Sequence, residues 1–123
     1  MEPDFVDHII LSVKDLKKST EFYSKLLGKA TIQKYDVSWK IGKTKFFITY
    51  PYKKNPKKFD KHNLGLNHIA FGVNKLQKLK EMQKVLDKNN IKNSGIKIDK
   101  YGKKEFIWFD DPDKIRLEFY LRK

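Results

Sequence analysis

The chain has 123 residues, which fits one domain with an ordinary hydrophobic core and excludes two large independent ones. It contains no cysteine, so disulfides, thiolate metal ligands and cysteine catalysis are excluded. Its formal net charge is +13 at pH 7, but all of its 28 basic residues except Arg116 and Arg122 are lysines, whereas sequence-specific nucleic-acid recognition favours arginine. We therefore expect a solvated lysine surface and no specific nucleic-acid partner.

The first half of the chain predicts a strand, a helix and three further strands. An almost wholly apolar run over residues 6–13 is typical of a strand buried on both faces. Asp15 is a candidate cap for the next helix, whose apolar residues recur at helical spacing up to Leu27, and Gly28 suits its C-terminus. Further strands are predicted over residues 30–35, 37–41 and 45–50, the last two joined by a turn at 42–44.

The second half repeats this order after an exposed, lysine-rich connection over residues 51–63. A strand is predicted over 68–73, and Asn74 is a candidate cap for a helix that ends at Asn89-Asn90. The remaining predicted strands cover residues 96–98, 106–109 and 115–121. Each half therefore reads β-α-β-β-β, and we predict an α+β fold with two βαβββ repeats, about residues 5–50 and 66–121, in a single domain over 1–123. Because one such unit leaves one sheet face uncovered, the two units must pack or pair to enclose a cleft.

The two predicted first strands resemble each other. Asp7-His8-Ile9-Ile10-Leu11-Ser12-Val13 corresponds to Asn67-His68-Ile69-Ala70-Phe71-Gly72-Val73 sixty residues later. Alternation along a strand places His8 and His68 on the face opposite the bulkier side chains, which should pack against the helices. The histidines are thus expected on the concave face of each half.

The last predicted strand adds a carboxylate to this set. Glu118 shares a face with Arg116 and Tyr120, opposite the apolar residues of the same strand. A carboxylate inside a strand is costly unless it is paired or bound to a metal. Two imidazoles and one carboxylate (His8, His68 and Glu118) make the facial triad that suits a divalent metal with open coordination positions. The alternative is that each histidine is a hydrogen-bonded core residue and that Glu118 pairs with Arg116 or a lysine.

These motifs, together with Leu26-Leu27-Gly28 and Phe109-Asp110-Asp111-Pro112-Asp113, resemble the vicinal oxygen chelate superfamily, which includes lactoylglutathione lyases, fosfomycin-resistance proteins, extradiol dioxygenases and bleomycin-resistance proteins. The resemblance covers essentially the whole chain. It implies two βαβββ modules that form a curved, cleft-enclosing mixed sheet with helices on its outer face, usually completed in a homodimer. It also implies a divalent metal at His8, His68 and Glu118, with manganese, nickel, zinc and iron as candidates.

One departure from the family pattern bears on the reaction. Lactoylglutathione lyases place a further acidic ligand in the fourth strand, but residues 45–50 contain none, and no carboxylate occurs between Asp36 and Asp60. Proton abstraction next to a carbonyl therefore loses its obvious base. The reaction type stays open among lyase or isomerase, thiol transferase and dioxygenase chemistry on a small-molecule substrate.

Two functions from different classes remain. The first is a metalloenzyme in which the ion polarises a substrate oxygen. The second is a metal-free small-molecule or antibiotic-binding protein of the bleomycin-resistance type. In both, aromatic side chains are expected to line the ligand site: Trp39, Phe47, Trp108 and Tyr120. No apolar run approaches the roughly 18 residues that a membrane span requires, and the first residues lack the pattern of a signal peptide, so we expect a soluble cytoplasmic protein.

Overall fold

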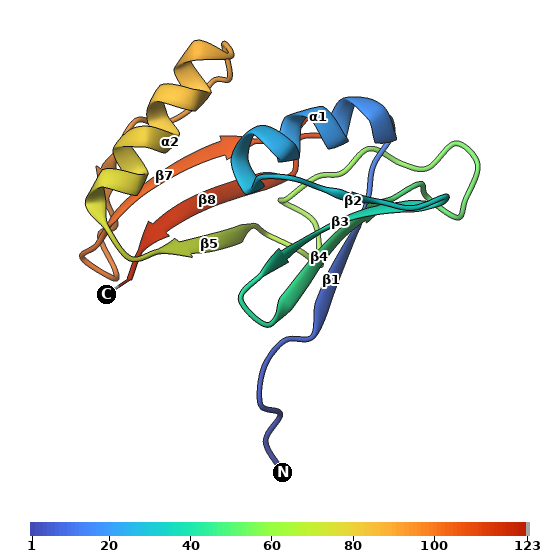
Figure 1. Ribbon diagram of the computed structural model, residues 1–123, viewed down its shortest axis with the longest axis horizontal. Helices are drawn as coiled ribbons and strands as arrows, with labels where there is room; N and C mark the ends of the chain where they lie inside the picture. Colours follow the sequence, from blue (N-terminus) through green and yellow to red (C-terminus); the bar gives the residue numbers. More distant parts are fainter. Residues whose placement is uncertain (123) are drawn as a thin grey trace. The chain divides into compact units, whose positions relative to one another are not determined.

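The computed structural model describes residues 1–122, which form two compact units, Met1–Lys57 and a second unit from Lys58 onward (Figure 1). Each unit contains one helix and one four-stranded sheet. The predicted α+β fold with two βαβββ modules is therefore confirmed, and each module forms a mixed sheet of its own. No helix in the described residues is both long enough and apolar enough to cross a membrane.

The first unit has the strand order β1-β4-β3-β2, with β1 parallel to β4 and the other neighbours antiparallel. Its helix covers one face of this sheet and contacts β4. The core between them contains Tyr23, Phe46 and Ile48, each 1% exposed or less. The elements are β1 (His8–Ser12), α1 (Leu16–Leu27), β2 (Thr31–Ile32), β3 (Asp36–Ile41) and β4 (Thr44–Thr49).

Both ends of α1 follow the sequence prediction. Asp15 is the N-cap, and its carboxylate accepts a hydrogen bond of 3.0 Å from the backbone N–H of Lys18, which satisfies one of the free donors of the first turn. Gly28 ends the helix with φ +91°, a conformation that costs side-chain-bearing residues strain. The apolar stripe of the helix is thereby held against the sheet.

The second unit repeats this arrangement with the order β5-β8-β7-β6, and β5 is parallel to β8. Its helix lies along β5, β8 and β7, as Figure 1 shows. Leu79, Leu86 and Leu117 are fully buried between helix and sheet. The elements are β5 (Ile69–Val73), α2 (Leu76–Lys88), β6 (Lys97–Ile98), β7 (Glu105–Asp110) and β8 (Arg116–Leu121).

The start of α2 differs from the prediction. Asn74 is not the cap: the N-cap is Lys75, which makes no side-chain capping hydrogen bond because lysine carries no acceptor. The C-terminus agrees with the prediction, since Asn89 caps the helix and Asn90 takes φ +57°, which asparagine tolerates. The strands β2 and β6 are two residues each, both shorter than the predicted runs, and both lie at sheet edges.

Candidate functional site

The sheet face of the second unit that points away from α2 carries the polar residues. Residues opposite each other in register lie on one face, and Glu118 is paired with Ala70 on β5 and with Trp108 on β7. Tyr120 is paired in the same way with Gly72 and Phe106. Small residues on β5 therefore leave room above the carboxylate and the phenol, which is how the sequence creates a hollow on this face.

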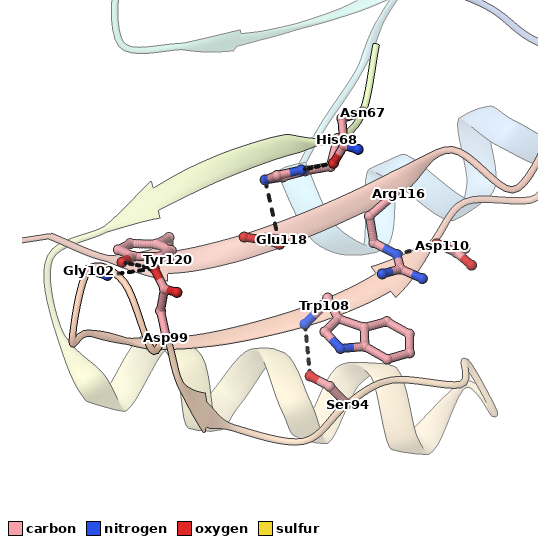
Figure 2. Close-up of polar contacts among 10 residues, drawn as sticks. All are labelled: Asn67, His68, Ser94, Asp99, Gly102, Trp108, Asp110, Arg116, Glu118 and Tyr120. Atoms are coloured by element: carbon pink, nitrogen blue, oxygen red, sulfur yellow. Dashed lines mark hydrogen bonds and ion pairs between the residues drawn. The ribbon is translucent and has the colours of Figure 1, made fainter. Parts of the chain in front are cut away.

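His68 and Glu118 approach each other across this hollow (Figure 2). His68 Nε2 lies 3.6 Å from Glu118 Oε2, and the Glu118 side chain is only 16% exposed. Burial raises the pKa of the Glu118 carboxyl above its ordinary value, while the nearby His68 opposes that rise. Arg116 does not neutralise Glu118 by direct pairing, because its Nε donates to Asp110 Oδ1 at 2.7 Å. Glu118 is thus a half-buried carboxylate that lies beside an imidazole.

His8 and His68 occupy equivalent positions of the two repeats, and in each the Nδ1 atom contacts the side chain of the preceding residue. Nδ1 of His68 lies 2.6 Å from Asn67 Oδ1, and Nδ1 of His8 lies 2.8 Å from Asp7 Oδ2. A carboxylate or amide oxygen accepts, so Nδ1 is the donor in both pairs. A ring with its single proton on Nδ1 would present the lone pair of Nε2, the atom that a metal would bind.

The second unit contains a pocket of about 780 Å³ on this face. Glu118 and His68 line one part of it, and a loop between β6 and β7 lines another. Asp99 anchors this loop: its carboxylate accepts hydrogen bonds from the backbone N–H groups of Tyr101 and Gly102 and a 2.7 Å bond from the hydroxyl of Tyr120. These bonds lower the pKa of Asp99, and the bond to Asp99 raises the pKa of Tyr120. The wall of the pocket is therefore hydrogen-bonded into one arrangement (Figure 2).

The predicted aromatic site residues take different positions. Tyr120 lines the pocket, and its ring stacks on Phe106 with centroids 6.1 Å apart. Trp108 shares the face of Glu118, with the guanidinium of Arg116 4.0 Å above its ring. Phe47 lies on the corresponding face of the first unit, in edge-to-face contact with His8 at 6.0 Å.

Trp39 has a different environment from the one expected. Its side chain is 3% exposed, packs against Tyr23 and Phe46, and donates Nε1 to the carbonyl of Gly28 at the end of α1. Alternation along β3 explains this, because Trp39 shares the helix-covered face with buried Val37 while Ser38 and Lys40 share the other. This placement makes Trp39 a core residue.

Of the three predicted metal ligands, the structure brings His68 and Glu118 together in the second unit, and His8 stands at the start of β1 in the first. Across residues 1–122 no set of three His, Asp or Glu side chains is arranged to hold an ion. The third histidine, His62, is exposed as expected and pairs with Asp60.

Sequence reasoning missed Asp99 and Gly102. A side chain at Gly102 would overlap the Tyr120 hydroxyl, so the close approach of the loop requires glycine there. The Asp-x-x-Gly spacing of an Asx-type turn was the available signal.

The comparisons with known proteins agree with this architecture of two βαβββ modules with a polar face. Residues 5–119 match the sequence model of the Glyoxalase/Bleomycin resistance protein/Dioxygenase superfamily. The chain belongs to this superfamily. A curated relative, the uncharacterized protein YwkD of Bacillus subtilis (strain 168), is 27% identical over 124 residues that cover 94% of each chain.

Solved structures share the fold. A glyoxylase/bleomycin resistance protein/dioxygenase domain from Frankia sp. EAN1pec has a TM-score of 0.83 at 22% identity, covering 99% of this chain and 94% of that one. The fosfomycin resistance protein FosX from Listeria monocytogenes has a TM-score of 0.74 at 18% identity, covering 99% and 96%. At these identities the likeness shows the fold alone.

Proposed function

We propose that the protein is a metal-dependent enzyme, a lyase or transferase of the glyoxalase or fosfomycin-resistance type, that acts on a small-molecule substrate. The divalent ion, manganese, nickel, zinc or iron, would be held by His8, His68 and Glu118. The observation that carries the proposal is the approach of His68 Nε2 to Glu118 Oε2, 3.6 Å apart in the pocket of the second unit.

The donor set fits such an ion. Imidazole and carboxylate together suit divalent first-row metals. A ligating histidine usually donates its other ring N–H to an oxygen, which fixes the tautomer, and Asn67 and Asp7 supply that oxygen for His68 and His8. The raised pKa of Glu118 also indicates a carboxylate whose desolvation is not compensated by the protein itself. A bound cation would provide that compensation.

The remaining residues of the pocket would bind and orient the substrate. A divalent ion at this place supplies Lewis-acid polarisation of a substrate oxygen. The stacked rings of Phe106 and Tyr120 offer an apolar wall beside Glu118, and Trp108 continues it along β7. The phenol of Tyr120 donates a hydrogen bond to Asp99, so its oxygen can only accept a hydrogen bond from a ligand.

Strand edges support assembly into a homodimer. Both β1 and β5 are edge strands of their sheets, and long unpaired edges are commonly covered by another element or copy. His8 would therefore reach the ion from the same chain or from a second copy.

A metal-free binding protein is the second candidate. The aromatic pair of Phe106 and Tyr120 favours it, because stacked rings beside a pocket also suit capture of a planar ligand. In that case His68 and Glu118 would serve as polar contacts to the ligand.

Metal analysis and calorimetric titration test the proposal. Protein purified without chelator or a nickel column is analysed for bound metal, and apo-protein is titrated with manganese, nickel, zinc and iron(II). We expect tight binding of at least one ion and a strong loss in His8→Ala, His68→Ala and Glu118→Gln, with folding retained because these side chains lie outside the helix-packed core. His62→Ala is the matched control, since His62 is exposed and pairs with Asp60. If wild type and Glu118→Gln bind every ion equally weakly, the metalloenzyme proposal is refuted and the metal-free binding protein is favoured.

A further inference from the structure

Three basic side chains form one row across the first sheet. In the register of β1, β4 and β3, Lys45 lies opposite His8 on one side and opposite Lys40 on the other. Directly opposite residues point to the same face, and this face is the one away from α1, because Trp39 and Phe46 on the other face are buried. The row His8–Lys45–Lys40 therefore places two lysines beside a histidine on the open face of the first unit.

The two lysines carry no compensating charge in their own unit. Like charges directly opposite in an antiparallel pair destabilise a sheet. Within residues 1–57 no carboxylate lies within pairing distance of Lys40 or Lys45. An anion bound between the two lysines would relieve the repulsion between their charges.

The lysines also border a hollow. A pocket of about 320 Å³ is lined by both of them, by Phe47 and Trp39, and by three small or amide-bearing polar residues: Thr31, Gln33 and Ser38. Phe47 lies two residues after Lys45 on β4, so both share one face, and Phe47 lies opposite Ser38. The pocket thus combines two ammonium groups, hydroxyl and amide groups, and the ring of Phe47, a set that matches an oxyanion joined to a small apolar body.

We propose that Lys40 and Lys45 bind a compact oxyanion, the carboxylate, phosphate or phosphonate group of the substrate, with Phe47 against its apolar part. The assignment to substrate rests on the proposed function, because the neighbouring His8 is a proposed metal ligand. The oxyanion site itself does not depend on a metal. It also gives the fourth strand, which lacks a carboxylate, a role in selecting anionic substrates.

Titration of metal-free full-length protein tests this inference. After chelator treatment and dialysis, ¹⁵N-labelled protein is titrated with inorganic phosphate, phenylphosphonate and benzoate at constant ionic strength. We expect saturable amide shifts centred on Ser38, Lys40, Lys45 and Phe47, with the aromatic phosphonate tighter than phosphate. Benzoate against phenylphosphonate distinguishes the two classes of oxyanion.

Charge-neutral variants provide the comparison. Lys40→Gln and Lys45→Gln should each weaken phenylphosphonate binding about threefold to tenfold, and the double variant should weaken it more, because each loses one charge-assisted contact. Lys25→Gln is the control. It removes the same charge from an exposed position on α1 and should leave binding unchanged.

Two results would overturn the inference: shifts spread evenly over the lysines of the chain, or equal weakening by Lys25→Gln. Either result would mean that the anions associate nonspecifically with the positively charged surface and do not occupy a binding site. Because no metal is present, loss of metal binding in the earlier experiment leaves this result unaffected, and the two failures are distinguishable.

Discussion

Replacing Gly102 by alanine should detach the β6–β7 loop from Tyr120. A methyl at this position would overlap the Tyr120 hydroxyl and would lie 2.9 Å from Asp99 Oδ2 and 3.3 Å from Tyr120 Cζ. Carbon and oxygen atoms pack at about 3.5 Å, so the hydroxyl must retreat by roughly 1.5 Å. If it moves away from Asp99, the bond between Tyr120 and Asp99, now 2.7 Å, would lengthen to about 4.2 Å, which is no longer a hydrogen bond.

The pKa values of the two partners report the loss. Their mutual hydrogen bond is the largest cause both of the lowered pKa of Asp99 and of the raised pKa of Tyr120. In Gly102→Ala the pKa of Tyr120 should therefore fall towards its ordinary value and that of Asp99 should rise. Tyrosine ¹³Cζ and aspartate ¹³Cγ chemical shifts, followed by NMR during pH titration, measure both.

A matched control lies in the same pocket. Gly72 on β5 has nothing within 4 Å of the added carbon, and its φ is not positive, so Gly72→Ala should leave the Tyr120 titration unchanged. Its effect on the free energy of unfolding should be small, since strand alanine loses less backbone entropy than glycine. If Gly102→Ala also leaves the Tyr120 titration as in wild type, the contact between loop and phenol does not hold the pocket wall.

Three further predictions concern charge and assembly. Because burial raises the pKa of Glu118 above its unfolded value, ionisation of Glu118 destabilises the metal-free fold as the pH rises through the folded pKa. At pH 7 Glu118→Gln should therefore unfold at a higher urea concentration than wild type. The difference should vanish below about pH 4, which urea denaturation at several pH values can show. Lys45→Gln should raise the free energy of unfolding by about 0.2–1 kcal/mol at low salt by removing a like-charge cross-strand pair, and unchanged urea midpoints would contradict this. Light scattering should give a dimer, whereas a mass of 14.7 kDa would refute it.

The regular parts of the fold were predictable because they depend on local periodicity. Alternation along the predicted strands placed His8, His68 and Glu118 on the faces away from the helices. The contact of His8 with Phe47 and the shared pocket of His68 and Glu118 agree with this placement. The helical stripes and the glycine after Leu27 likewise set the extent of α1. These features need no knowledge of what packs against what.

The remaining features depend on tertiary contacts. Asp99 and Tyr120 are 21 residues apart, and only the folded loop shows that Gly102 must lie against the phenol. Trp39 was predicted to line the ligand site because of its residue type. Alternation along β3, however, places its side chain on the helix-covered face, in contact with Tyr23. Aromatic character indicates burial equally in a core and in a site, so residue type alone does not decide between them.

Unfavourable electrostatics mark the two open sheet faces. In the second unit a half-buried carboxylate has its pKa raised by burial, and in the first unit two lysines stand opposite each other without a carboxylate partner. Either feature lowers the stability of the empty protein, and each would be relieved by a ligand of opposite charge: a cation beside Glu118, an oxyanion between Lys40 and Lys45. Unfavourable charges of this kind are expected at positions where a sequence is selected for binding and not for stability. Glu118→Gln and Lys45→Gln should therefore each stabilise the ligand-free fold. The first should weaken cation binding and the second oxyanion binding, and a purely structural role would not combine higher stability with weaker binding.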